Sequence, residues 1–440
     1  IEKYLVKKIT EPVDWKVTVP GSKSMTNRAL LMAVLSAGTV RVEGVLFSDD
    51  SRHFLACLVA LGFTVEIEEE KKCVTVTGCG GRIPRGEAVI DVGSAGTAAR
   101  FLAAMLGFSD GCYEIRCSAQ MKRRPMAELF DLLSGAGAKI TFLEEEGHLP
   151  VRITGCRYAR ADKTAGETPR ELSLDITKST QFLSALLLIA PMVPEGMKIH
   201  ITSEKTDGSY IRITRKMMQE FGVSVAFDGR DYEVPCRSSY RKETYMVEPD
   251  MSAACYFYAA AAVTGGRALV RHVHMDNTQG DLRFLEVLEH MGCTADDTPE
   301  GILVTGPADG ALRGITVNMN DFSDQALTLA AIAPFADAPV RIEGIGHIRG
   351  QECDRIHAIQ TNLTALGIRC EEEETAATIY PGSPHGGSVE TYDDHRVAMA
   401  FSLVGLRTDG IVIENPACCR KTFENYFTVL SELTGKKMEA

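Results

Sequence analysis

The chain has 440 residues, of which 45% are hydrophobic and 24% charged, the composition of a soluble globular protein. This length exceeds one ordinary core, so about two domains are expected. The net charge of −12 argues against nucleic acid as a default partner. The sequence contains no apolar run long enough to span a bilayer and begins without a secretory leader, so we expect a cytoplasmic protein without membrane contact.

The first predicted core element is the segment Pro20–Gly38, in which a Pro-Gly-Ser turn leads into a helix rich in Ala, Leu and Met. The helix is apolar on nearly every side, which predicts burial with only its N-terminus at the surface. That end offers unpaired N–H groups beside Lys23 and Arg28 and is a candidate anion site. The alternative is an ordinary capped helix whose cations only solvate its end. The residues before Lys23 do not match GxxxxGK[ST], which excludes a nucleotide P-loop.

Five more helices of this kind follow at intervals of 71 to 85 residues, each rich in Ala and Leu and each opening with small polar residues. Each interval holds a second, amphipathic helix that ends in a Gly turn, and two strands follow it. The repeat predicts an α/β fold of six βαβαββ units with buried helices, the last copy cut short at Tyr426–Leu430. The core helices are marked by Ser22, Ser94, Ser179, Ser252, Ser323 and Asp394, and the turns by Gly62, Gly137, Gly222, Gly292 and Gly367.

Six units divide most simply into three and three, with a break in the polar segment Cys236–Glu248. This division predicts an N-terminal domain of residues 21–245 and a C-terminal domain of residues 246–440. Because the sixth unit lacks its closing strands, we expect residues 1–20 to complete the C-terminal domain, with Trp15–Val19 as the added strand. A cleft between two such domains is a common place for a ligand.

The 13 cysteines are odd in number and include no CxxC pair, which predicts free thiols in a reducing compartment rather than a disulfide framework. Cys117 lies near Arg124 in the sequence, and a nucleophilic thiol there is the alternative to ordinary core packing.

Unusual polar residues gather at the starts of core helices or at equivalent turns of the repeat. Two cations about 6 Å apart repel by roughly 3 kcal/mol at an effective dielectric of 20, so a bound phosphate or carboxylate would relieve a site that collects them. The alternative for each cation is a local carboxylate partner. Two acids share these positions: Asp324 could be an N-cap and Glu352 an ion-pair partner, but among cations both could transfer protons. The cations are Lys23, Arg28, Arg124, Arg355, Arg396 and Lys421.

The motifs around these residues resemble those of the 5-enolpyruvylshikimate-3-phosphate (EPSP) synthase family of enolpyruvyl transferases, over essentially the whole chain. The resemblance implies an inside-out α/β fold of two domains with three βαβαββ units each. It implies transfer of the enolpyruvyl group of phosphoenolpyruvate to the 5-hydroxyl of shikimate 3-phosphate by addition and elimination, with release of phosphate, on the route to chorismate and aromatic amino acids. It also implies a monomer that needs neither metal nor organic cofactor. The motifs are Pro20–Ser24, Asn27–Leu30, Ala95–Arg100, Arg124-Pro125, Ser179–Leu186, Gln279-Gly280-Asp281, Glu352–Arg355, Asp394–Met399 and Lys421-Thr422-Phe423.

The resemblance further implies residue roles. Asp324 would take the proton of the attacking hydroxyl, and Glu352 with Lys23 would protonate the methylene carbon. Contacts to phosphoenolpyruvate would come from Lys23, Gly96, Thr97, Arg124, Gln181, Arg355, His395, Arg396 and Lys421. Contacts to shikimate 3-phosphate would come from Ser24, Arg28, Ser179, Thr180, Gln181, Ser203, Tyr210, Asp324, His347 and Gln351.

Three positions depart from the family pattern: Gln351 replaces a common Lys, His347 replaces an Asn found in some members, and Phe101 replaces a usual Pro. Two alternatives remain. A UDP-N-acetylglucosamine enolpyruvyl transferase would have Asn in place of Ser24 and a cysteine signature in the loop around Arg124. A phosphometabolite-binding protein that lost catalysis would have no use for Asp324 and Glu352.

Overall fold

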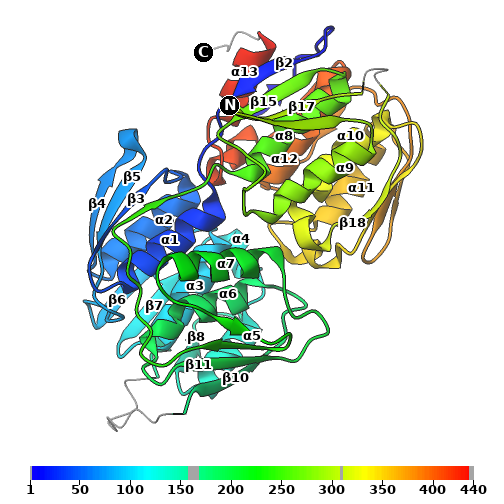
Figure 1. Ribbon diagram of the computed structural model, residues 1–440. Coiled ribbons are helices and arrows are strands. Elements are labelled where there is room, and N and C mark those ends of the chain that lie inside the picture. Colours follow the sequence, from blue (N-terminus) through cyan, green and yellow to red (C-terminus); the bar gives the residue numbers. More distant parts are fainter. Residues whose placement is uncertain (1, 157–167, 308–310, 436–440) are drawn as a thin grey trace. The chain divides into compact units, whose positions relative to one another are not determined.

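The computed structural model describes residues 2–156, 168–307 and 311–435, and the chain forms two compact units (Figure 1). One, called here the N-terminal unit, comprises residues 21–247, and the other, the C-terminal unit, comprises residues 1–20 and 248–440. Both combine buried helices with small sheets, so the predicted α/β class with buried helices is confirmed. Within the described residues, we find no helix with the length and apolar character of a membrane span.

The N-terminal unit is built around three helices whose side chains are almost all buried. Because these helices satisfy their backbone hydrogen bonds internally and are apolar on nearly every side, burial costs them little. Helices of a second kind and a short helix accompany them. The core helices are α1 (Lys23–Leu35), α3 (Gly96–Gly107) and α6 (Gln181–Ile189), and the others are α2 (Asp49–Ala60), α4 (Ala119–Lys122), α5 (Ala127–Gly135) and α7 (Ser209–Glu220), with 3-10 turns η1 (Glu69–Lys71) and η2 (Ala190–Met192).

Among its described residues, the N-terminal unit has three four-stranded sheets. In each sheet, the first strand in spatial order is parallel to the second. The third strand is antiparallel to the second, and the fourth is antiparallel to the third. In spatial order the sheets are β14 (Thr244–Met246), β3 (Thr39–Glu43), β5 (Cys73–Thr77) and β4 (Thr64–Glu68); β6 (Glu87–Asp91), β7 (Cys112–Arg116), β9 (Val151–Thr154) and β8 (Lys139–Phe142); and β10 (Arg170–Leu174), β11 (Met197–Ile201), β13 (Asp231–Val234) and β12 (Ala226–Phe227).

The C-terminal unit has a similar arrangement with its own core helices, but one of its described sheets has three strands instead of four. They are α8 (Met251–Thr264), α10 (Ala326–Ile332) and α12 (His395–Arg407), accompanied by α9 (Phe284–His290), α11 (Arg355–Ala365) and α13 (Tyr426–Thr434). The described part of this unit also has the 3-10 segments η3 (Gly280–Arg283), η4 (Asn320–Gln325), η5 (Ala333–Phe335), η6 (Gly346–Gly350) and η7 (Pro416–Lys421). The sheets are β2 (Asp14–Val17), β15 (Arg267–Arg271), β17 (Gly301–Thr305) and β16 (Thr294–Thr298); β18 (Thr316–Asn318), β19 (Val340–Glu343), β21 (Ala377–Ile379) and β20 (Cys370–Glu372); and β22 (Gly387–Val389), β23 (Ile411–Glu414) and β1 (Lys3–Leu5).

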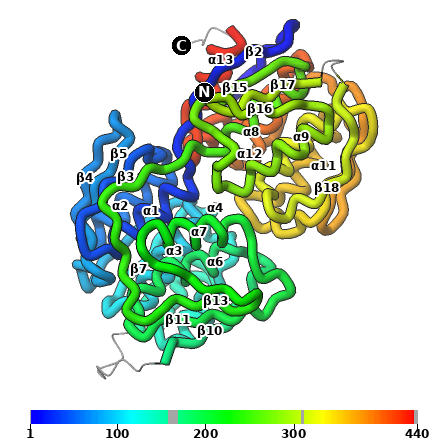
Figure 2. Tube along the Cα trace, in the orientation of Figure 1, coloured from blue at the N-terminus to red at the C-terminus, as the bar shows by residue number. Residues whose placement is uncertain are grey.

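The expected place of the N-terminal strand is wrong in one respect. The strand β2 does not join the sixth unit but pairs in parallel with β15. In Figure 2 the blue β2 segment lies beside the green β15 segment. The sheet of the sixth unit is instead completed by β1, which pairs antiparallel with β23. In the sheets of both units, the first strand is parallel to the second, and the third is antiparallel to the second. The strand β2 occupies the first position in its sheet, and β1 occupies the third position in the sheet of the sixth unit.

The Gly turns after the second helices lie where the sequence predicts them. All five have φ between 84° and 109°, a region that residues with a side chain rarely adopt.

One core helix differs from expectation at its start. Ser323, Asp324 and Gln325 lie in the 3-10 segment η4, and the α-helix α10 begins only at Ala326. The backbone just before these residues is non-helical at Phe322, with φ of −143° and ψ of 45°.

Candidate active site

In the N-terminal unit, the start of α1 carries the first predicted cation. The hydroxyl of Ser22 caps the helix by accepting from the backbone N–H of Met25 at 3.4 Å. Lys23 follows, and its ammonium lies 3.5 Å from Oδ2 of Asp50 on α2. Both side chains are largely buried, so Lys23 is a cation with a local carboxylate partner at a helix N-terminus.

Arg28 lies one turn further along α1 and is buried. Its Nε donates to Oγ1 of Thr214 at 2.8 Å, its Nη1 donates to the carbonyl of Ser24 at 2.9 Å, and its Nη2 donates to Oγ of Ser184 at 3.3 Å. Burial lowers its pKa to about 10, against the opposing effect of Tyr210.

Two aromatic rings lie over the Arg28 guanidinium. The centroid of Phe101 is 5.2 Å from its central carbon and that of Tyr210 is 5.7 Å away. Phe101, one of the departures from the family pattern, therefore packs against a predicted substrate-binding cation.

Gly96 begins α3 and lies against two arginines. A Cβ atom added at Gly96 would come within 2.3 Å of Nη1 of Arg124 and within 2.7 Å of Nη1 of Arg100. Arg100 donates to the carbonyl of Gly96 at 3.2 Å and to Oε1 of Gln181 at 3.0 Å. The N-termini of α3 and α6 and the Arg124 loop thus meet at one place in this unit.

The remaining predicted residues of the N-terminal unit lie at helix starts. Thr97 is in the first turn of α3, and Thr180 is the N-cap residue of α6. Ser179 Oγ accepts from the backbone N–H of Gln181 at 3.1 Å. The Ser203 hydroxyl is engaged by the backbone, because it accepts from Ile176 at 3.1 Å and donates to the carbonyl of Lys205 at 2.7 Å.

In the C-terminal unit, a buried guanidinium links both predicted acids. Arg355, 1% exposed, begins α11, and its Nη1 donates to Oδ1 of Asp324 at 3.1 Å and to Oε1 of Gln351 at 2.5 Å. Its Nη2 donates to Oε2 of Glu352 at 2.8 Å, and its Nε donates to Oδ2 of Asp394 at 2.8 Å. Burial alone would lower the pKa of Arg355. The negative charges of Asp394, Glu352 and Asp324 have the larger combined effect and raise the pKa above its ordinary value.

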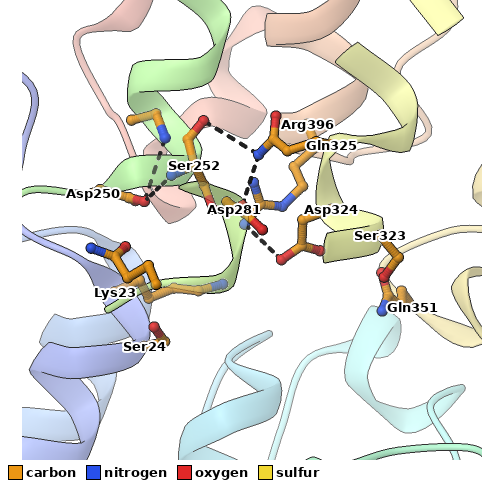
Figure 3. Close-up of polar contacts among 12 residues, drawn as sticks. Lys23, Ser24, Asp250, Ser252, Asp281, Ser323, Asp324, Gln325, Gln351 and Arg396 are labelled. Atoms are coloured by element: carbon orange, nitrogen blue, oxygen red, sulfur yellow. Dashed lines mark hydrogen bonds and ion pairs between the residues drawn. The ribbon is translucent and has the colours of Figure 1, made fainter. Parts of the chain in front are cut away.

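Asp324 contacts a second guanidinium, since Nη2 of Arg396 lies 3.3 Å from its Oδ2 (Figure 3). Arg396 is in the first turn of α12, and its Nη1 donates to the Tyr256 hydroxyl at 3.4 Å. The carboxylate of Asp324 therefore lies between two arginines from different helices.

The other predicted residues of this unit lie at adjoining helix starts and turns. Lys421 donates to the carbonyl of Asp393 at 3.1 Å. His395 is buried at the start of α12, with its Nδ1 3.8 Å from Oδ1 of Asp394. His347 Nε2 is hydrogen-bonded to Oγ of Ser323 at 2.8 Å.

The sequence predicted that clustered cations would repel one another, but the structure gives four of them carboxylate partners. Lys23, Arg355, Arg396 and Lys421 each have a carboxylate within 4 Å in their own unit, so local anions offset part of the repulsion. These pairs are mostly buried rather than on the surface, where an ion pair would be worth little.

Asp394 is the site residue to which the sequence assigned no role. It served only to mark a helix start, and it is the N-cap of α12, accepting from the backbone N–H of Arg396 at 2.9 Å. The run Asp393–Arg396 marks this helix start in the sequence, but the sequence does not indicate which of its two aspartates contacts Arg355.

Cys117 does not have the character of a nucleophile. Burial raises the pKa of its thiol to about 11, against the opposing effect of Lys122, so the thiolate is scarce at neutral pH. Ordinary packing, the expected reading, is the better account.

Comparison with known proteins bears on what this arrangement does. Residues 7–430 match the family model described as "EPSP synthase (3-phosphoshikimate 1-carboxyvinyltransferase)". A 3-phosphoshikimate 1-carboxyvinyltransferase of Trichormus variabilis is 41% identical over 429 residues, 97% of this chain and 98% of the relative. One from a Sulfurovum species is 39% identical over 427 residues, 96% of this chain and 97% of the relative.

A comparison with solved structures also finds an EPSP synthase. An EPSP synthase from Acinetobacter baumannii aligns with a TM-score of 0.79 and 25% identity, covering 100% of this chain and 99% of that one. The enolpyruvyl transferase NikO from Streptomyces tendae aligns with a TM-score of 0.73 over 98% of this chain and 97% of its own, and at 16% identity it supports the fold alone.

Proposed function

The chain belongs to the EPSP synthase (3-phosphoshikimate 1-carboxyvinyltransferase) family, and from this premise we propose how its residues carry out the reaction. It is an enolpyruvyl transferase of aromatic amino acid biosynthesis. The substrates are phosphoenolpyruvate and shikimate 3-phosphate, and the products are EPSP and phosphate.

The first chemical step is an addition. Asp324 takes the proton of the 5-hydroxyl as that oxygen bonds to C2 of phosphoenolpyruvate, and Glu352, assisted by Lys23, delivers a proton to the methylene carbon C3. The product is a tetrahedral intermediate. In the elimination, Glu352, now a carboxylate, takes a proton from C3 as the bond between C2 and the phosphate oxygen breaks and the double bond re-forms. The phosphate leaves with the proton that Asp324 took from the hydroxyl.

Cations make phosphate a good leaving group by neutralising its charge in advance. For phosphoenolpyruvate these are Lys23, Arg124, Arg355, Arg396 and Lys421, with Gly96, Thr97, Gln181 and His395 beside it. For shikimate 3-phosphate the binding residues are Ser24, Arg28, Ser179, Thr180, Gln181, Tyr210, Asp324, His347 and Gln351. Ser203 is the weakest member of this set, because backbone groups already engage its hydroxyl.

The observation that carries the proposal is the fork of Arg355, which contacts both Asp324 and Glu352. The guanidinium favours the ionised form of Asp324, as a proton acceptor requires, and it holds Glu352 in place, which must take up a proton before it can deliver one to C3. A protein that only bound anions would gain affinity by losing both acids.

The replacement Asp324→Ala tests this assignment. We expect the rate of phosphate release to fall by on the order of 100-fold or more, while calorimetry still detects binding of shikimate 3-phosphate. The matched control is Asp321→Ala on the same segment, whose carboxylate lies 3.6 Å from Arg283, and turnover should persist in it. Near-normal turnover of Asp324→Ala would remove Asp324 from the mechanism.

We also propose that the enzyme acts as a monomer in the cytoplasm. The support for the compartment is that each of the 13 cysteines is a free thiol.

A further inference from the structure

The motif Gln279-Gly280-Asp281 has no place in the mechanism described so far, yet it lies against the segment that carries Asp324. Asp281 is in η3, which packs on η4, and it is only 5% exposed. A buried carboxylate is costly unless it is hydrogen-bonded or paired, so its partners indicate its purpose.

Two side chains from different elements donate to one oxygen of Asp281 (Figure 3). The Ser252 hydroxyl, in the first turn of α8, donates to Oδ2, and Nε2 of Gln325 donates to the same atom at 2.8 Å. Gln279 reinforces the attachment to α8, because its Oε1 accepts from the backbone N–H of Met251 at 3.1 Å.

Gln325 is the residue after Asp324, and its side chain is held at both ends. Its amide nitrogen donates to Asp281, and its Oε1 accepts from Oγ1 of Thr328 at 2.9 Å. Gln325 is fully buried. The backbone at Phe322 is non-helical, so the segment that carries Asp324 is not one regular helix, and these side-chain bonds add to what holds it in place.

We infer that Asp281 is a positioning residue for Asp324: by holding Gln325 and Ser252, it fixes the turn that directs the Asp324 carboxylate toward the guanidinia of Arg355 and Arg396. The inference rests on the proposed role of Asp324 as proton acceptor.

The charges around Asp281 agree with this role. Burial and the negative charge of Asp324 raise the pKa of Asp281 to about 6, while Arg396 and the bonds from Ser252 and Gln325 lower it. On α8, Cys255 is close enough to Asp281 for the carboxylate to contribute to raising the pKa of its thiol, after the larger effect of burial. The Asp281 and Asp324 carboxylates therefore interact electrostatically, as expected of neighbours in one polar cluster.

A double-mutant cycle tests the inference in the full-length enzyme. We expect Asp281→Ala to lower kcat by on the order of 10- to 100-fold, with KM for both substrates changed less than about threefold, because misplacing a catalytic group affects chemistry more than binding. In the Asp324→Ala background the same replacement should change kcat less than about threefold, since the group through which Asp281 acts is gone.

A second replacement and a control keep the test decisive. Asp281→Asn preserves the size of the side chain and serves in the same cycle if Asp281→Ala does not fold. Ser431→Ala breaks another buried hydrogen bond of this unit, the 2.7 Å contact with the Tyr4 hydroxyl, and should lower the melting temperature without changing kcat.

The outcomes separate the two proposals. An equal loss of kcat from the Asp281 replacement with and without Asp324, or a loss no greater than that of Ser431→Ala, overturns the positioning role. Retained turnover in Asp324→Ala alone overturns the proposed function instead.

Discussion

Arg355 shows how one buried side chain can organise several acids at once. Its fork reaches Asp324, Glu352 and Asp394 together, and a lysine, with a single point of charge, cannot reproduce that geometry. Removing the fork would leave the fully buried carboxylate of Asp394 without its guanidinium partner, which is costly.

We therefore predict that Arg355→Lys lowers the free energy of unfolding of the C-terminal unit by about 3 kcal/mol and abolishes turnover. Arg349→Lys is the control, because Arg349 contacts Asp354 and Glu372 at a more exposed place and should cost less than about 1 kcal/mol. Trp15, the single tryptophan of the chain, is buried in the core of that unit, so its fluorescence in urea measures both changes. Equal effects of the two replacements would contradict the account.

Asp281 gives a prediction about pH. Its folded pKa of about 6 exceeds the unfolded value of 3.8, so its contribution to stability is complete below about pH 4 and is lost as the pH rises through 6. Asp281→Asn cannot ionise and lacks this loss. The unfolding free energy of the variant minus that of the parent, followed by Trp15 fluorescence, should therefore increase from pH 4.5 to pH 7. A difference that stays constant over this range would contradict the assigned pKa.

At the scale of elements, the candidate residues lie at helix starts in each unit, and at one of these starts a small residue makes room for neighbouring side chains. Gly96 at the start of α3 leaves room for the Arg124 and Arg100 side chains. We predict that Gly96→Ala raises KM for phosphoenolpyruvate at least tenfold, because the added methyl group displaces Arg124.

Gly135→Ala is the matched control for this change. Gly135 ends α5 with no heavy atom within 4 Å of the added Cβ, so its replacement should leave KM unchanged and stabilise the unit by about 0.5–1 kcal/mol. If Gly96→Ala left steady-state KM unchanged, Arg124 would not depend on this space.

The sequence predicted those elements whose signals are local. The all-round apolar helices and their Gly turns follow from side-chain pattern and backbone preference, and both are confirmed. The partner of β2 and the 3-10 form of η4 could not be predicted, because strand pairing and the turn at Phe322 depend on residues far away in the sequence. For the same reason, the sequence identified Arg355 and Glu352 as neighbours but not Asp394 as their third partner.

At the scale of the whole molecule, a protein with a net charge of −12 acts on two anionic substrates. The acidic excess lies elsewhere, as in Glu66–Glu70 and Glu371–Glu374, while buried arginines and lysines occupy the helix starts. Each unit supplies part of the proposed machinery: Lys23, Arg28 and Arg124 belong to one, and the two acids and Arg355 to the other. Neither unit alone carries the complete set.

The most direct test of the account is phosphate release from phosphoenolpyruvate with two different acceptors. We predict rapid release with shikimate 3-phosphate and none above background with UDP-N-acetylglucosamine, at equal enzyme and acceptor concentrations. Release with UDP-N-acetylglucosamine alone, or with neither acceptor, would contradict the proposed reaction.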